Sequence, residues 1–232
     1  MTATKFSIIL STLAFFVFSS PSNASTLLTA GIEDGFAAPT EAANPSANFL
    51  ATVPATPGVN AGDFDEVSAN RNTLHTFDGL PAGIVSATLR FRVQGNPSVN
   101  ATGNGGDGII LAFSDSDSDD LADDLVWSRT FGSTGSNGAL FVDNDPGLLT
   151  SGIWSGTSNE AGILDLSALP LAGGGTLDLF PLLNSNGFLD ILSGDDSTTD
   201  FFELAIEVPE PTSFALLSLS ALSACLRRLR VR

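Results

Sequence analysis

The sequence contains few of the side chains on which catalytic and metal chemistry usually depends. Its 232 residues include one His, one Cys and no Tyr. A single Cys forms neither an internal disulfide nor a thiolate zinc site. Only nine Lys and Arg stand against 26 Asp and Glu, and this balance excludes an ordinary nucleic-acid-binding protein, because phosphate recognition rests on basic side chains. No reaction is apparent from this inventory, and the length fits one domain with two terminal segments.

The first 24 residues are typical of a secretory signal peptide. Lys5 supplies a positive start, and residues 6–18 are apolar apart from small hydroxyl side chains. Small residues follow at both positions that a signal peptidase needs, so we expect cleavage between Ala24 and Ser25. A retained membrane helix is the alternative, but the apolar stretch is short for a bilayer.

Residues 208–232 combine a Pro-Glu-Pro motif, an apolar stretch and a basic end. The motif and the start of the basic end are Pro209, Glu210, Pro211, Arg227 and Arg228. The two prolines favour an extended backbone before the apolar stretch. That stretch, 212–226, would span roughly 22 Å as a helix, less than the ~30 Å hydrocarbon core of a bilayer. The arginines beyond it would stay on the cytoplasmic side, which leaves the rest of the chain outside.

This tail resembles the PEP-CTERM sorting signal of Gram-negative bacteria, in which the same three parts occur in the same order. The resemblance covers residues 208–232 only and does not identify the family of the body. It implies export by the general secretory route and an inner-membrane anchor, transient or retained. It further implies cleavage near the motif by an exosortase, a membrane transpeptidase-like enzyme, and association with exopolysaccharide or biofilm. A plain anchor with a chance motif predicts the same topology.

The segment between these ends, residues 25–207, is predicted to be one acidic domain. It has four arginines, no lysine and 25 Asp and Glu, a net charge of −21. Such a charge favours solubility and bound cations, and outside the cell Ca²⁺ is the obvious counterion because it prefers oxygen ligands. A solvated acidic surface is the alternative and needs no specific site.

The hydrophobic pattern predicts an all-β domain, an antiparallel β-sandwich of jelly-roll type, with a signal helix before it and an apolar helix after it. Apolar and polar residues alternate over 85–94, and one face of 200–208 is apolar, as in half-buried antiparallel strands. Further strands are predicted at 108–113, 125–131, 139–142, 162–166, 176–180 and 187–192. Residues 26–71 suggest loops with one or two short strands. No segment of the body shows a helical period, and Gly- and Asn-rich turns separate the strands.

One dense acidic cluster has the spacing of a calcium loop. Asp115, Asp117, Asp119 and Asp123 reproduce the D-x-D-x-D-x-x-x-D pattern, in which alternate carboxylates turn towards one cation. The segment resembles the calcium loops of dockerin and thrombospondin type 3 repeats. It departs from them at Asp120, where those loops have the Gly of a sharp turn, and it lacks the Glu that completes an EF-hand. The alternative is a solvated acidic loop.

Two Trp residues and the single His complete the set of candidates. Trp154 is flanked by glycines, so it is either an exposed platform for sugar stacking or a packed loop anchor. Trp127 lies in a predicted strand and is expected in the core. His75 is expected to be structural, because no Gly-x-Ser-x-Gly nucleophile elbow occurs.

We therefore expect an exported, non-enzymatic protein of the cell surface or extracellular matrix, processed by signal peptidase and exosortase and associated with exopolysaccharide. The alternative is a calcium-dependent carbohydrate-binding module, with Ca²⁺ as its cofactor. A secreted hydrolase is the third possibility, because a glycosidase needs only two carboxylates.

Overall fold

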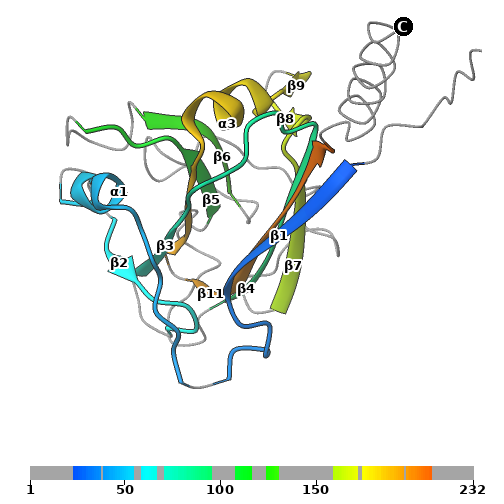
Figure 1. The fold of residues 1–232 in the computed structure, drawn as a ribbon. Coiled ribbons are helices and arrows are strands. Elements are labelled where there is room, and N and C mark those ends of the chain that lie inside the picture. The colour runs from blue at the N-terminus through cyan, green and yellow to red at the C-terminus, as the bar shows by residue number, and fades with distance from the viewer. Residues whose placement is uncertain are drawn as a thin grey trace, which may run out of the picture. The chain divides into compact units, whose positions relative to one another are not determined.

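The computed structural model describes residues 23–37, 39–54, 59–66, 71–95, 108–116, 124–130, 159–171, 174–195 and 197–210. Within these ranges the protein is mostly β, with several antiparallel sheets and few helices (Figure 1). Asn23–Pro209 forms one compact unit. Among the described residues, no helix has the length and apolar character needed to cross a membrane. The predicted signal helix, the predicted apolar C-terminal helix and the predicted strand at 139–142 lie outside the described residues.

A four-stranded sheet has the order β1-β11-β4-β7, and every neighbouring pair in it is antiparallel. Its strands are β1 (Asn23–Gly31), β4 (Ser86–Gly95), β7 (Asn159–Asp165) and β11 (Ser197–Pro209). The alternation predicted for 85–94 is confirmed within β4, which buries Ala87, Leu89, Phe91 and Val93 to 1% exposure or less. It fails at Val85, which precedes β4 and is 48% exposed. In β11 the predicted apolar face is buried in the same way, at Phe202, Leu204 and Ile206.

A five-stranded sheet has the order β2-β3-β10-β5-β6 and is antiparallel except between β2 and β3. Its strands are β2 (Ala61–Gly62), β3 (Arg71–Phe77), β5 (Gly108–Ala112), β6 (Leu125–Thr130) and β10 (Leu189–Asp195). A two-stranded sheet joins β8 (Leu169–Pro170) to β9 (Thr176–Leu177).

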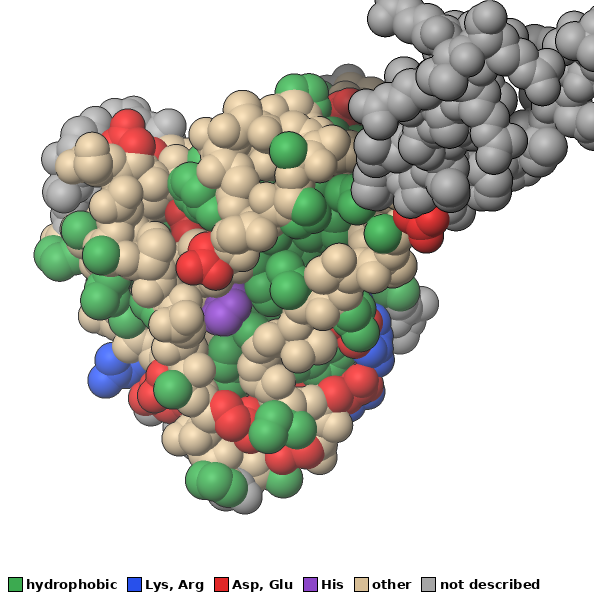
Figure 2. All heavy atoms as spheres, viewed as in Figure 1, with side chains coloured by type: hydrophobic (Ala, Val, Ile, Leu, Met, Phe, Trp, Pro, Cys, Tyr) green, Lys and Arg blue, Asp and Glu red, His purple; other side chains and the backbone are tan. Residues whose placement is uncertain are grey.

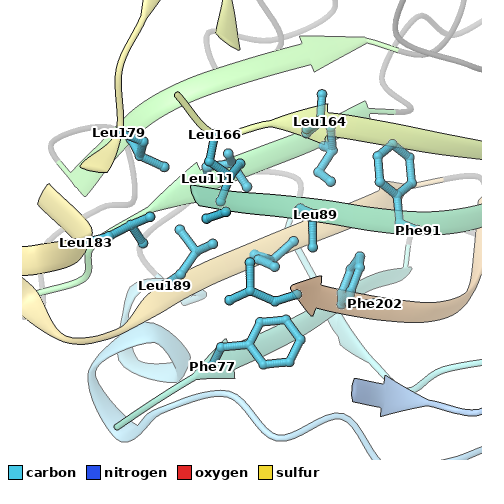
Figure 3. Packing of buried hydrophobic residues seen from close by; sticks show 14 of the residues in the cluster. Phe77, Leu89, Phe91, Leu111, Leu164, Leu166, Leu179, Leu183, Leu189 and Phe202 are labelled. Atoms are coloured by element: carbon cyan, nitrogen blue, oxygen red, sulfur yellow. The ribbon is translucent and has the colours of Figure 1, made fainter. Parts of the chain in front are cut away.

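The main hydrophobic core draws its residues from both large sheets (Figure 3). Leu89 and Phe91 of β4 and Phe202 of β11 belong to the same cluster as Phe77, Leu111 and Leu189 of the five-stranded sheet. Trp127 of β6 also belongs to it and is 4% exposed, as predicted for a core residue. The Trp127 indole nitrogen donates to the carbonyl of Pro170 at 2.9 Å, which satisfies its polar atom within the core.

A second cluster occupies the other face of the five-stranded sheet, beneath helix α1 (Ala47–Thr52). Phe49 of α1 is fully buried with Leu74, Ile110 and Leu192 from three of the strands. The Ser46 hydroxyl caps the helix by accepting from the Phe49 amide at 3.1 Å. This cap and one aromatic anchor hold a helix that is too short to be stable by itself.

The prediction that the body contains no helix was wrong at two places, α1 and α3 (Phe180–Asn186). The strand predicted at 176–180 ends at Leu177, and α3 follows it with Pro181 in its first turn. Gly187, where the predicted strand 187–192 begins, instead ends the helix in a left-handed conformation with φ of 73°, and β10 starts at Leu189. Short helices of six or seven residues hold less than two turns, so periodicity gives little signal of them.

Candidate functional site

The predicted calcium loop is described only at its edges. Asp115 is exposed at the end of β5, and Asp117, Asp119 and Asp123 lie outside the described residues. The amide of Asp115 donates to the Asp124 carboxylate at 3.3 Å, so the two ends of the acidic segment meet. The predicted arrangement of the four carboxylates around a cation stays a prediction.

A buried carboxylate, Asp190 of β10, holds the base of this acidic segment. Asp190 is fully buried, and it accepts hydrogen bonds from the Thr76 hydroxyl of β3 and, at 2.9 Å, from the Ser114 amide. Burial raises the pKa of the Asp190 carboxyl, against the lowering effect of these donors. Ser114 directly precedes Asp115. Its hydrogen bond to Asp190 therefore links the start of the acidic segment to β10, the middle strand of the sheet.

The predicted processing residues lie at the two ends of the described body. Ala24 and Ser25 are in β1, opposite Val208 and Glu207 of β11, and Asn23 stands opposite Pro209. Glu210 follows the end of β11. The remaining processing residues, Pro211, Arg227 and Arg228, and the predicted sugar platform Trp154 lie outside the described residues.

The structure brings together three aspartates that are far apart in the sequence. Asp34 follows β1, Asp65 follows Phe64, and Asp200 is the extra residue at a β-bulge in β11 between Thr199 and Phe201. One carboxylate oxygen from each of Asp34, Asp65 and Asp200 lies within 4.8 Å of the others. Figure 2 shows acidic side chains at the lower end of this face, where Figure 1 shows the loop after β1.

Gly31 allows the loop after β1 to approach the bulge. Its φ is 71°, and a Cβ at this position would overlap the Asp200 carbonyl oxygen and the Phe64 ring. Any other residue would be strained here both by its backbone conformation and by lack of space. The close approach lets the amides of Asp34 and Phe36 donate to the Asp200 carboxylate at 3.4 and 3.3 Å.

Asp65 differs from its two neighbours because its carboxylate has no hydrogen-bond partner among the described residues. The side chain is 6% exposed, and both of its oxygens are buried. Burial, the nearby carboxylates of Asp200, Glu41 and Asp34, and the approach of the Glu41 carboxyl, which favours a proton on Asp65, raise the pKa of Asp65 to about 7. Its backbone is held in place by an amide hydrogen bond to the Thr199 carbonyl at 2.9 Å and has a φ of 57°.

Two arginines of β4 border the aspartate cluster. Arg92 contacts the second oxygen of Asp200 at 3.4 Å and Glu33 at 3.3 Å. Arg90 donates to both Glu33 oxygens, at 2.6 and 3.0 Å, which lowers the pKa of Glu33 and raises that of Arg90. Both guanidinium groups lie over the Phe201 ring, at 4.8 and 6.0 Å from its centre.

His75 is packed among aromatic rings. Its ring centre is 4.7 Å from that of Phe77 and 6.0 Å from that of Phe64. Burial lowers the pKa of His75 to about 4, so the imidazole is neutral at physiological pH. Its Nδ1 atom is buried and has no hydrogen-bond partner among the described residues.

A shallow groove of about 350 Å³ lies beside α1, β2 and β3. Leu50 and Leu74 contribute apolar surface, and Asp63, Glu66 and Arg71 contribute charge. The Arg71 guanidinium lies 3.6 Å from Glu66. The lining of the groove is therefore partly apolar and partly charged, and Arg71 and Glu66 form an ion pair within it.

The sequence shows Asp200 as part of an acidic group with Asp195 and Asp196, but it does not reveal the spatial partners of Asp200. Asp34 and Asp65 are separated from it by more than one hundred residues and belong to no common motif. The only local signal is that each lies in a short Gly- and acid-containing segment, 33–35 or 62–66. No family model, curated protein or solved structure matches this chain.

Proposed function

We propose that this protein is an exported, non-enzymatic component of the cell surface or extracellular matrix, delivered by its signal peptide and its PEP-CTERM-like tail. The body would be a β-sandwich of jelly-roll type, and the hydrophobic cluster drawn from both large sheets supports that architecture. The acidic charge of residues 25–207 suits a soluble body outside the cell.

The observation that carries the proposal is the pairing of β1 with β11. Nine consecutive residue pairs run from Asn23 opposite Pro209 to Gly31 opposite Phe201. The chain therefore enters and leaves the body at adjacent positions of one sheet. Adjacent ends suit a precursor with a membrane segment at each end, because both segments can then reach the same bilayer while the folded body stays on one side of it.

Processing of the full chain tests the proposal. In a Gram-negative host that expresses an exosortase, the chain should lose its N-terminal segment at Ala24–Ser25 and its tail near Pro209, and the product should be found outside the cytoplasm. Replacement of Glu210 by Ala should abolish the second cleavage, and Glu207→Ala, three residues upstream in β11, should leave it unchanged. An unprocessed chain dissolved in the cytosol would contradict the proposal.

A calcium-dependent carbohydrate-binding module is the second candidate. The hydrogen bond between Asp115 and Asp124 favours it, because a loop closed at its base can direct alternate carboxylates inward. Glycan-array binding that needs calcium and is lost on Trp154→Ala would favour this function over a purely structural one. Turnover of glycosidic or ester substrates by the exported protein would instead support the third candidate, a secreted hydrolase.

A further inference from the structure

We propose that Asp34, Asp65 and Asp200 form a calcium-binding site, separate from the acidic segment that begins at Asp115. The three carboxylates come from the loop after β1, the turn after Phe64 and the bulge of β11. Their nearest oxygens lie within 4.8 Å of one another, and all three side chains are hard oxygen ligands.

The independent observation is the state of Asp65. Its carboxylate is more than nine-tenths buried, lies within the cluster, and accepts no hydrogen bond from the described residues. A buried carboxylate with no partner is strongly unfavourable. A cation shared with Asp34 and Asp200 would supply a partner to the Asp65 oxygen that faces the cluster.

The spacing favours calcium over smaller cations. Two oxygens that bind the same ion lie no further apart than twice the metal–oxygen distance. This upper limit is roughly 4.6–5.2 Å for Ca²⁺ and about 4.2 Å for Mg²⁺. Oxygens up to 4.8 Å apart are therefore within reach of one calcium ion. The ligand set contains no imidazole or thiolate, which disfavours zinc.

Arg92 does not occupy this site, although it is the cation nearest to it among the described residues. It contacts one oxygen of Asp200 and shares its guanidinium with Glu33. Among the described residues, the other Asp200 oxygen accepts two long amide hydrogen bonds, from Asp34 and Phe36. Three carboxylates, with Glu41 also near Asp65, leave a net negative charge beside the two bordering arginines, both of which also pair with Glu33.

Calcium at this position would be structural. It would join the loop after β1 to the bulge of β11, next to the point where the β1–β11 pairing ends at Gly31 and Phe201. Calcium would thus stabilise the fold where extracellular calcium is plentiful and leave it weaker where calcium is scarce.

Calcium titration of the full chain in detergent tests the site, with calorimetry for affinity and thermal unfolding for stability. At a free calcium concentration of about 100 times Kd, Tm should rise by roughly 5–10 °C over the value in chelator. Asp65→Asn should weaken this binding at least about tenfold and remove the rise in Tm. Asp34→Asn should also weaken calcium binding. Because Asp34 is at an exposed loop position, this variant tests the site even if Asp65→Asn fails to fold.

Two control variants make the result specific. Asp78→Asn removes a carboxylate from an exposed turn after β3 and should leave binding and Tm as in the wild type. A double variant of the acidic segment, Asp117→Asn with Asp119→Asn, should keep the calcium effect that depends on Asp65. The inference is overturned if calcium leaves the wild-type Tm unchanged, or if the double variant loses the effect and Asp65→Asn retains it.

Discussion

Replacement of His75 by Phe should remove a loss of stability that the wild-type protein shows in mildly acidic solution. The imidazole is 9% exposed, and burial lowers its pKa from 6.5 to about 4. Between these two pH values the unfolded chain binds a proton that the folded protein does not, so the free energy of unfolding falls as the pH decreases from 6.5 to 4. At about 1.4 kcal/mol for each pH unit, His75 accounts for roughly 3 kcal/mol of this fall. Phe carries no proton and suits a site between Phe64 and Phe77.

The single histidine makes this prediction directly measurable. In a chain without a histidine tag, the imidazole signals in an NMR titration belong to His75 alone and should titrate near pH 4. Urea unfolding at pH 7.5 and pH 4.5 should then show a larger loss of stability for the wild type than for His75→Phe. Other titrating groups, Asp65 among them, contribute equally to both proteins and cancel in the comparison. Parallel pH profiles, or an imidazole that titrates near 6.5 in the folded protein, would refute the reasoning.

Three further substitutions test other parts of the fold by urea unfolding. In calcium-free solution the raised pKa of Asp65 contributes a loss of stability as the pH rises from about 4 to about 7, opposite in sign to the His75 contribution, so Asp65→Asn should gain stability relative to the wild type over this range. Gly162→Ala should lower the free energy of unfolding by about 1–3 kcal/mol, because the added Cβ would overlap the Phe91 ring. Combining it with Phe91→Leu should recover part of that loss. If the losses of the two single variants simply add in the double variant, this packing contact is contradicted. Asp190→Asn should cost about 1–3 kcal/mol, because an amide cannot replace both acceptor oxygens; an unchanged stability would mean that these hydrogen bonds contribute little.

The strands with a strict alternation of apolar and polar residues could be predicted from the sequence. In β4 and in the second half of β11 the side-chain period of two decides which residues are buried, whereas residues 197–202 of β11 are buried on both faces by the elements that pack on them. Shorter elements escaped this reasoning. Helix α3 follows a two-residue strand, and its Leu-rich start fits a strand or a helix equally well until the residues that pack on it are known.

The aspartate cluster could not be predicted, since its members share no spacing along the chain. Asp200 becomes a neighbour of Asp34 only because β1 pairs with β11 and Gly31 allows the loop to turn beneath the bulge. Asp65 joins them through the hydrogen bond of its amide to Thr199. Each of these contacts links segments more than thirty residues apart.

Composition and local pattern by themselves determined the acidic character of the body and the alternation of its principal strands. They also determined that the two terminal segments have the features of export signals. Each of these properties is set within a short stretch of chain. Only the tertiary structure decided that the ends of the body are adjacent and that Asp190 is buried against the amide of Ser114. It also decided that Asp65, whose carboxylate has no hydrogen-bond partner among the described residues, lies close to Asp34 and Asp200. Burial and proximity depend on which strands pair, and that pairing results from packing the whole hydrophobic core at once.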